Sequence, residues 1–477
     1  MPVLVPAPVV PVPARVAVVR NSMVLRDLFS VKMNKPTVVE LKPGLYAYHR
    51  NSNGDKAQIH LRVDEDSSGL LVINAARIMH LNPTALRMAR LYLEQVPQKE
   101  ALRTLSALYN VPAKQLKQDY ELTAQKIETL ISGDGSVCPV CDLGLDIDMP
   151  FSRQLSAPYR MDLAITYRCN NACAHCYNAR PRNYPELSTD QWKTIIDKVW
   201  KNRIPHVVFT GGEPTLREDL VDLISYAQKT GLVCGLNTNG RKLADPAYLE
   251  QLKQAGLDHV QITLESADED VHDHMVRAKG AWKETVQGVR NAVNSGLYMM
   301  TNSTLLRDNV PHLTALLNFL KDLGVPTVGL NALIYSGRGK EVDTGLKETE
   351  LPPLLNLAKA VTQANNQRLI WYTPTQYCHF DPMQLELGIK GCTAAMYNMC
   401  VEPDGQVIPC QSFYEPIGSL LSGTWQDIWN HPLALDLRHR KNIPEGCIYC
   451  DLLPECGGGC PLAREHQNVQ PVIQSIH

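Results

Sequence analysis

The chain has 477 residues, of which 20% are charged, and a formal net charge of −2. This length allows about three domains of roughly 150 residues each, and the balanced charge, without a long basic block, gives no reason to expect nucleic acid as a partner. The first 22 residues alternate Val and Pro, which suits neither a membrane helix nor the core of a signal peptide. No other stretch approaches the roughly 20 uninterrupted apolar residues of a membrane span. We therefore expect a cytoplasmic protein without a membrane partner, with residues 1–35 as an extended or disordered tail.

Residues 36–132 are predicted to form a small α+β module. Alternating apolar and polar residues predict three strands, in 44–50, 56–63 and 67–82. Helical periodicity begins at Asn82 and Pro83, because proline suits the first turn of a helix. Two more helices are expected over 101–109 and 112–131.

The helical part of this module carries the stretches LNPTALRMARLYLEQ and ALYNVPAKQLKQDYELTAQKIETL. With three strands before them, they resemble the PqqD-like recognition element of ribosomal-peptide biosynthesis, which has a winged-helix-like order of elements. The resemblance implies capture of a leader peptide by strand addition to the sheet edge beside the third helix. The alternative is a winged-helix DNA-binding domain. Its middle helix would offer only Lys99 and Arg103 as basic residues, too few for phosphate contacts.

Residues 133–158 form a Gly- and Asp-rich linker that holds Cys138 and Cys141. A single CPVC pair is compatible with a redox pair, half of a metal site, or neither. The chain has fourteen cysteines in all, grouped in close motifs, and no export signal. Metal ligation is therefore a better interpretation than disulfides. Cys234, in an apolar strand, is expected to be a reduced thiol that binds no metal, and for Cys378 this is the alternative to a ligand role.

Residues 159–340 alternate short apolar strands with amphipathic helices. Six strands are expected, in MDLAITY, HVVFTG, LVCGLNTN, HVQITLES, YMMTNSTLL and TVGLNALI, separated by helices starting near 189, 217, 246, 282 and 312. Such a pattern predicts a parallel sheet covered by helices, either barrel-like or open and doubly wound. In both cases function gathers at the carboxyl ends of the strands. Residues 341–391 are expected to connect this region to the next, with a helix over 351–365.

Three cysteines with CxxxCxxC spacing, Cys169, Cys173 and Cys176, follow the first of these strands directly. One short loop can wrap three such thiolates around a compact iron–sulfur cluster. Three ligands for four irons leave one iron open for a small molecule. A structural zinc site would instead close its coordination with a fourth protein ligand.

This motif, with His175 before the third cysteine and Gly211-Gly212-Glu213-Pro214 after the second strand, resembles the radical S-adenosylmethionine (SAM) enzymes. The resemblance implies a partial (β/α)6 barrel and an α/β fold. It makes Cys169, Cys173 and Cys176 the ligands of a 4Fe–4S cluster that binds SAM through its open iron. His175 would lie against the adenine, Gly211 and Gly212 would approach the methionyl group, and Glu213 would face its ammonium. The remaining nucleoside contacts would be Asn237, Thr238, Asn239, Thr263, Glu265, Asn302, Ser303 and Ile334 with the Gly337-Arg338-Gly339 turn.

The last third of the chain, 392–466, contains seven more cysteines before a final tail, 467–477. Their pattern, Cx12Gx4C followed by Cx2Cx5Cx3C, resembles the SPASM extension, which binds auxiliary iron–sulfur clusters. A zinc ribbon is the alternative. The resemblance assigns one cluster to Cys392, Cys400, Cys410 and Cys460 and a second to Cys447, Cys450 and Cys456. The usual last cysteine of the pattern is not found after Cys460. The open candidates for a fourth ligand are His466, Glu465, Cys378 and the pair Cys138 and Cys141.

Together these resemblances imply a maturase that cleaves SAM reductively to a 5′-deoxyadenosyl radical and modifies a precursor peptide held by its leader. Crosslinking, epimerisation and excision all remain open as the reaction. An electron donor such as flavodoxin or ferredoxin is implied. The alternatives are a maturase of a haem-like precursor or of a protein partner, and a non-enzymatic, metal-stabilised peptide-binding scaffold.

Overall fold

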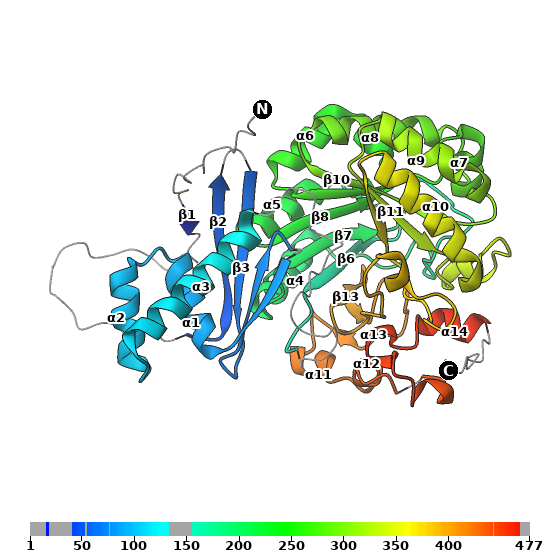
Figure 1. Ribbon diagram of the computed structural model, residues 1–477. Coiled ribbons are helices and arrows are strands. Elements are labelled where there is room, and N and C mark those ends of the chain that lie inside the picture. Colours follow the sequence, from blue (N-terminus) through cyan, green and yellow to red (C-terminus); the bar gives the residue numbers. More distant parts are fainter. Residues whose placement is uncertain are drawn as a thin grey trace, which may run out of the picture. The chain divides into compact units, whose positions relative to one another are not determined.

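The structure is a computed structural model that describes residues 16–18, 41–52, 55–75, 77–132, 155–441 and 443–467. Cys138, Cys141 and most of both predicted tails lie outside these residues. The chain divides into two compact units, Met1–Asp134 and Gly135–His477 (Figure 1).

The N-terminal unit contains an antiparallel sheet with strand order β1-β2-β3-β4-β5. The strands are β1 (Val16–Val18), β2 (Gly44–Ser52), β3 (Asp55–Val63), β4 (Gly69–Ile73) and β5 (Arg77–Leu81). The prediction of one strand over 67–82 was wrong, because this stretch is the β4–β5 hairpin. It turns at Asn74 and Ala75, whose φ angles are 52° and 56°. Ala75 is an unusual residue for the left-handed region, so this turn was hard to predict from the sequence.

Three helices follow the sheet as predicted: α1 (Pro83–Leu93), α2 (Gln98–Leu108) and α3 (Ala113–Ser132). The Asn82 side chain caps α1 by accepting the backbone N–H groups of Thr84 and Ala85, and Pro83 occupies the first turn. Leu86, Ala89 and Leu93 of α1 pack with Ile127 of α3 against the sheet core.

The second unit is built on a ten-stranded sheet with order β12-β11-β10-β9-β8-β7-β6-β13-β14-β15. The parallel strands are β6 (Arg160–Thr166), β7 (His206–Gly211), β8 (Val233–Thr238), β9 (His259–Thr263), β10 (Tyr298–Leu305), β11 (Thr327–Ala332) and β12 (Arg368–Trp371). Because neighbours in the sheet are also neighbours in sequence from β6 to β12, the sheet is wound in one direction. This order confirms the partial barrel and rules out the doubly wound alternative.

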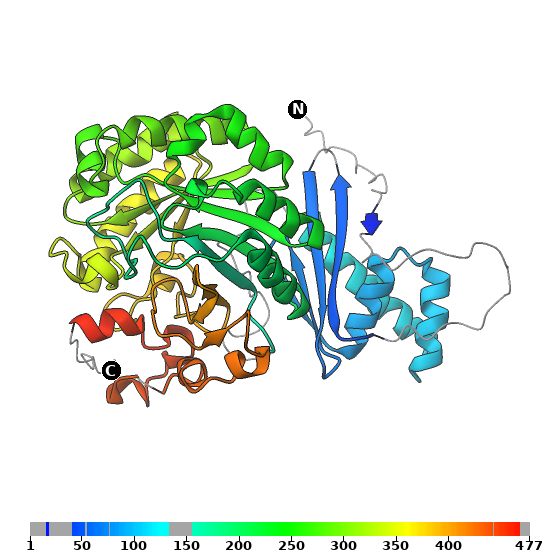
Figure 2. The same ribbon diagram turned by 180° about the vertical axis from the view of Figure 1, so that it is seen from behind.

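Helices connect these strands. They are α4 (Thr189–Lys201), α5 (Leu220–Thr230), α6 (Pro246–Gln254), α7 (Glu269–Val276), α8 (Ala281–Asn294), α9 (Leu313–Asp322) and α10 (Leu351–Ala364). Figure 2 shows this helical layer from behind. Fully buried side chains from the helices, such as Trp192, Leu223 and Leu317, join Phe209 and Val260 of the strands in one core. The parallel winding places the carboxyl ends of the strands, and the loops after them, at one end of the barrel.

The C-terminal cysteine-rich region continues the same sheet. Strand β13 (Asn398–Val401) pairs in parallel with β6, and β14 (Gln406–Ile408) and β15 (Gly418–Ser419) add antiparallel to it. Short helices α11 (Trp425–Trp429), α12 (Pro432–Arg438), α13 (Leu453–Cys456) and α14 (Pro461–Gln467) complete it. Within the described residues, no helix is both long enough and apolar enough to cross a membrane.

Candidate active site and C-terminal cysteine sets

The loop after β6 gathers three half-buried thiols, Cys169, Cys173 and Cys176. Burial raises the pKa of Cys169 to about 11, with smaller contributions from neighbouring charges that include Cys176. Burial also raises the pKa of Cys173, and the charges of Cys176 and Cys169 add to the effect. The three thiols therefore lie within electrostatic range of one another.

The backbone of this cysteine loop is held from two sides. The N–H of Ala172 donates to the carbonyl of Val276 at the end of α7 (2.9 Å). Arg338 Nε donates to the carbonyl of Cys173 (2.9 Å). Gly337 precedes this arginine with φ of 53°, and a Cβ there would lie 2.5 Å from a backbone oxygen of the loop. Only glycine allows this approach, which brings the turn after β11 onto the cysteine loop.

Gly211 and Gly212 bring the loop after β7 into direct backbone contact with the loop after β6. A Cβ on Gly211 would lie 2.0 Å from the carbonyl oxygen of Thr166, and one on Gly212 would lie 2.4 Å from that of Arg168. The Gly212 N–H donates to Thr166 O (2.7 Å). The glycines are therefore required for packing between the two loops, whatever ligand the loops bind.

Glu213 is fully buried and joins the loops after β7 and β8. One carboxylate oxygen accepts hydrogen bonds from Thr215 N (3.1 Å), Thr215 Oγ1 (2.6 Å) and Thr238 Oγ1 (2.7 Å), and the other accepts from Asn239 N (2.8 Å). Burial raises its pKa, and these hydrogen bonds act in the opposite direction. The carboxylate thus organises the backbone and hydroxyl groups around it.

His175 and Glu265 form a contact that could not be expected from the sequence. His175 Nε2 lies 2.9 Å from Glu265 Oε1, and Glu265 Oε2 accepts the N–H of Thr304 (2.8 Å). Glu265 has no exposed surface. It therefore fixes the histidine ring of the cysteine loop against the ends of β9 and β10. The two residues are far apart in sequence, so only the parallel sheet brings them together.

The other predicted SAM contacts differ in their surroundings. Asn237 Oδ1, Asn302 Oδ1 and His175 Nδ1 are buried without a hydrogen-bond partner in the described part of the chain. Thr263 lies beside Asn302 in register across β9 and β10. These atoms remain available to a polar ligand, since buried polar groups normally have partners.

A second group of the predicted contacts is already engaged within the protein. Asn239 Nδ2 donates to Asn170 Oδ1 (2.7 Å), and the Ser303 hydroxyl donates to the carbonyl of Leu264. The carbonyl of Ile334 accepts the N–H of Ser336 (2.8 Å). These interactions hold the loops in place.

The C-terminal cysteines fall into two sets. In the first, the charges of Cys392 and Cys460 add to burial in raising the pKa of Cys410 to about 12. Cys460 is affected by Cys392 in the same way. Cys400 lies in β13 of the sheet. Burial is the main cause that raises its pKa, the charge of Asp162 is the next, and the charge of Cys410 contributes less. The structure therefore brings Cys392, Cys410 and Cys460 together and places Cys400 at their margin.

The second set contains Cys447, Cys450 and Cys456. Burial and then the charges of Cys456 and Cys450 raise the pKa of Cys447. Cys456 is buried and Cys450 is exposed. Two separate groups of thiols, each drawn from several turns, are what two auxiliary clusters require.

Comparison with known families agrees with this geometry. The Radical SAM superfamily matches residues 163–331, and the iron–sulfur cluster-binding SPASM domain matches residues 392–451. The mycofactocin maturase MftC of Mycolicibacterium smegmatis is 30% identical over 324 residues, which cover 66% of this chain and 81% of that protein. The chain belongs to the radical SAM superfamily.

Two further relatives of this radical SAM enzyme have different functions. The PqqA peptide cyclase of Gluconobacter oxydans is 30% identical over 318 residues, covering 64% of this chain and 86% of that protein. The AdoMet-dependent heme synthase of Oleidesulfovibrio alaskensis is 25% identical over 330 residues, covering 65% and 85%. The superfamily is therefore shared by peptide-modifying and haem-forming relatives.

Solved structures share the fold. Streptococcus suis SuiB bound to its precursor peptide SuiA superposes with a TM-score of 0.65 at 15% identity, covering 87% of this chain and 96% of that one. The enzyme anSMEcpe with bound AdoMet gives a TM-score of 0.54 at 16% identity, covering 66% and 92%.

A radical SAM enzyme requires a 4Fe–4S cluster and SAM, and a SPASM domain binds auxiliary iron–sulfur clusters. The residues present fit these groups. No three His, Cys, Asp or Glu side chains among the described residues converge closely enough for a single metal ion. Cys169, Cys173 and Cys176 supply three thiols from one loop, which is the number of protein ligands that a cubane with one open iron takes. The orphaned oxygens of Asn237 and Asn302 suit the polar groups of a nucleoside.

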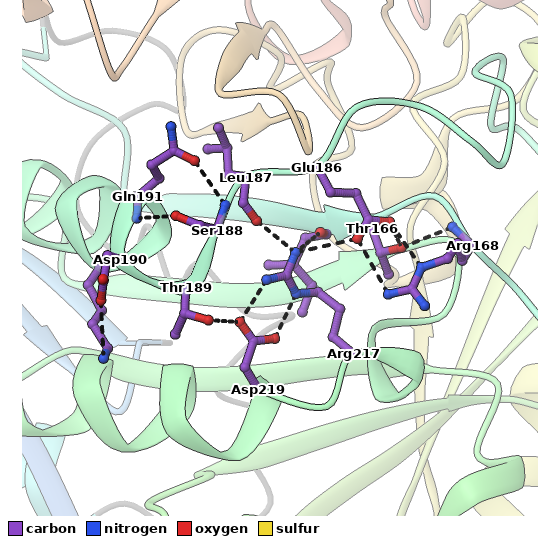
Figure 3. A network of polar contacts seen from close by, with 12 residues as sticks. Thr166, Arg168, Glu186, Leu187, Ser188, Thr189, Asp190, Gln191, Arg217 and Asp219 are labelled. Atoms are coloured by element: carbon purple, nitrogen blue, oxygen red, sulfur yellow. Dashed lines mark hydrogen bonds and ion pairs between the residues drawn. The ribbon is translucent and has the colours of Figure 1, made fainter.

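Arg217 is a further organising residue near the end of β6, and it was missed in the sequence, where a lone arginine carries no signal. It is buried, and its Nη1 donates to the carbonyls of Ile165 and Leu187 (3.1 Å each) (Figure 3). Its other nitrogens bind Asp219 at 2.7 and 2.8 Å, and Glu186 lies 3.5 Å away. This network joins the end of β6 to the start of α4 and α5.

We expect Arg217→Leu to lower the free energy of unfolding by about 3 kcal/mol, because it leaves buried carbonyls and a carboxylate without their donor. Arg168→Leu is the matched control. Arg168 also binds Glu186, but its side chain is 51% exposed, so the loss should stay below about 1 kcal/mol. All six tryptophans lie after residue 134, so denaturant unfolding followed by tryptophan fluorescence reports this unit alone. Equal shifts in the two variants would contradict the assignment.

Proposed function

We propose that this enzyme modifies a ribosomally made precursor peptide that it holds through a leader sequence. The supporting observation is the extent of the similarity to SuiB. Residues 135–477 make up less than three quarters of the chain, so coverage of 87% must extend into the N-terminal unit. SuiB was solved with its precursor peptide bound. A shared N-terminal unit favours the same class of partner.

In this proposal residues 36–132 of the N-terminal unit form a PqqD-like leader-binding module that adds the leader as a strand to its sheet. The edge strands of the sheet are β1 and β5. Strand β5 is held to the third helix, since Arg77 Nη1 donates to the carbonyl of Leu130 in α3 (2.5 Å). On the other side of the sheet, the edge of β2 is already covered by its pairing with β1. We therefore assign the leader to the β5 edge.

We assign the catalytic role to residues 159–340 and the auxiliary clusters to residues 392–466, joined by residues 341–391. Cys169, Cys173 and Cys176 hold the SAM cluster. His175, Glu213 and Glu265 shape its surroundings, together with the residues assigned to SAM in this proposal: Gly211, Gly212, Asn237, Thr238, Asn239, Thr263, Asn302, Ser303 and Ile334. The auxiliary ligands are Cys392, Cys400, Cys410, Cys447, Cys450, Cys456 and Cys460.

When bound, the cluster and SAM supply a 5′-deoxyadenosyl radical for hydrogen abstraction. The chain positions the reacting groups and excludes water from the site. Glu265 fixes the ring of His175 through the contact at 2.9 Å. Glu213 holds the backbone at Asn239 and the hydroxyl of Thr238 at the ends of neighbouring strands. The loops are thus organised before any ligand arrives.

The auxiliary clusters suit a reaction with net oxidation, such as a thioether or carbon–carbon crosslink, because the product radical must lose an electron. We propose flavodoxin or ferredoxin as the donor and the cytoplasm as the compartment. No disulfide links the twelve cysteines that the structure describes, which suits a reducing environment.

A haem-forming activity is the second candidate, because the AdoMet-dependent heme synthase is among the relatives. That similarity covers 65% of the chain, which is no more than the length of residues 135–477, so it need not include the N-terminal unit. A haem-forming activity would leave the N-terminal unit without a proposed role. The peptide-maturase hypothesis assigns a role to both units.

Co-expression tests the proposal. The full chain is expressed with each short peptide encoded beside its gene, and the peptide is analysed by mass spectrometry against a Cys173→Ala control. Loss of two hydrogens indicates a crosslink, unchanged mass with an altered stereocentre indicates epimerisation, and a larger loss indicates excision. Each supports a peptide maturase. Unmodified peptides, together with SAM-dependent conversion of a porphyrin precursor to haem, would overturn it.

A further inference from the structure

Four thiols from two distant parts of the chain meet in the C-terminal region. Three are Cys447, Cys450 and Cys456, for which the sequence pattern supplied no fourth partner. The fourth, Cys378, lies upstream of the SPASM match. It precedes the first cysteine of that match, Cys392, and follows β12.

The segment that carries Cys378 is packed directly on Cys456. The N–H of Tyr377, the residue before Cys378, donates to Cys456 Sγ (3.4 Å). Cys456 Sγ also lies 3.7 Å from the carbonyl of Thr375. A Cβ on Gly459 would lie 2.9 Å from Gln376 Cγ, so a glycine is needed for this close packing. Residues 375–377 therefore surround the sulfur of Cys456.

The turn at Cys378 is well braced. The N–H groups of His379 and Phe380 both donate to the carbonyl of Gln376 (2.8 and 2.9 Å). Glu348 accepts the N–H of Gln376 (3.1 Å) and lies 2.9 Å from His379 Nδ1. The residues on both sides of Cys378 are thus held by backbone and carboxylate contacts, which fixes where its thiol can reach.

The thiol of Cys378 interacts with two members of the set. Although the residue is exposed overall, partial burial of its sulfur, followed by the charges of Cys456 and Cys447, raises the pKa of Cys378 to about 11. Cys456 and Cys447 likewise interact with Cys450. The sulfur of Cys234, in contrast, lies near the carbonyls of Ile224 (3.9 Å) and Leu232 (3.7 Å) in the apolar core.

Of the other candidates, His466 is engaged elsewhere. Its ring stacks on Tyr335 with centroids 4.5 Å apart, beside a cavity of about 520 Å³ that Glu348 and His379 also line. Cys138 and Cys141 lie outside the described residues.

We propose that Cys378 is the fourth cysteine ligand of the auxiliary cluster held by Cys447, Cys450 and Cys456. The proposal rests on the assignment of these three thiols to a cluster under the proposed function. It makes this cluster fully cysteine-ligated, so that no iron of it is open to substrate. It also ties the stretch after β12 to the SPASM domain through the cluster.

Iron content and electron paramagnetic resonance of the reduced protein test this without any activity measurement. The background is the full chain with Cys169, Cys173 and Cys176 changed to Ala, so that only the C-terminal clusters contribute. In this background we expect Cys378→Ala to lose at least about one iron per chain and at most about four, which is one whole cluster. The spectrum should change in the same way as it does in Cys450→Ala. The double variant should lose no more than the more affected single variant, because both residues serve one cluster.

Cys234→Ala is the control and should leave iron and spectrum unchanged. Cys378→Ser should keep more iron than Cys378→Ala, since a hydroxyl oxygen can replace the sulfur as a weaker ligand. Cys378 is exposed, so loss of iron by misfolding is not expected, and circular dichroism checks this. If Cys450→Ala loses iron and Cys378→Ala does not, the role of Cys378 is refuted. If neither loses iron, the assignment of this cluster is refuted as well.

Discussion

Replacement of Cys173 by alanine is expected to abolish SAM cleavage. Cys173 interacts with both other thiols of the loop, and its backbone carbonyl is held by Arg338. Alanine leaves two ligands where three are needed to hold the cluster beside an open iron. Changes to residues that only support metal ligands lower metal affinity or activity by about tenfold to a hundredfold. Loss of a ligand should therefore lower the rate of SAM cleavage by more than about a hundredfold. The readout is 5′-deoxyadenosine formed by anaerobically reconstituted protein with a chemical reductant.

The control for this prediction is Cys234→Ala, which removes one thiol from the same barrel. Cys234 is fully buried in β8 and packs in the apolar core, so its loss should leave SAM cleavage near the wild-type rate. Iron content should fall by about four per chain in Cys173→Ala and stay constant in Cys234→Ala. SAM cleavage by Cys173→Ala within tenfold of wild type would contradict the assignment of the loop.

Loss of the Glu213 carboxylate is expected to have the second largest effect. In Glu213→Leu, the backbone N–H groups of Thr215 and Asn239 and the hydroxyls of Thr215 and Thr238 lose their acceptor. Each unsatisfied buried group costs about 1–3 kcal/mol, while removal of a buried charge recovers part of this. We expect a net loss of about 3 kcal/mol in the free energy of unfolding and SAM binding weakened at least about tenfold.

Two variants make the Glu213 prediction specific. Glu213→Gln keeps one acceptor oxygen and should show a smaller loss on both measures. Glu218→Gln changes an exposed carboxylate in the same loop and should change neither. Tryptophan fluorescence in denaturant gives the stability, and equilibrium dialysis against SAM gives the affinity. A fully stable Glu213→Leu with weakened SAM binding would instead indicate direct contact with the ligand and no structural role.

The parallel barrel could be predicted because its strands are short apolar runs with turn residues after them. The starts of α4, α6, α8 and α9 fell within one residue of expectation. Helix α7 was missed because EDVHDHMV is short and mostly polar, which gives little periodicity. The β4–β5 hairpin was missed because its turn uses Asn74 and Ala75 in place of glycine.

The thiols and the GGEP loop were visible in the sequence because their spacing is local. The contacts that hold them were not. Arg217 reaches Ile165 and Leu187, and Glu265 reaches His175, across strands that are distant along the chain. Such pairs depend on sheet order, which spacing does not encode. The same is true of β13, whose pairing with β6 joins the cysteine-rich region to the barrel sheet.

The most direct test of the central claim follows the abstracted hydrogen. The enzyme is incubated with SAM, reductant and a precursor peptide in which the residues after the leader are deuterated, and the mass of the 5′-deoxyadenosine product is measured. The account predicts that deuterium from the peptide appears in 5′-deoxyadenosine. A parallel reaction with a peptide lacking its leader should show little transfer. Product without deuterium, formed equally with and without peptide, would contradict the claim that a leader-bound peptide is the substrate.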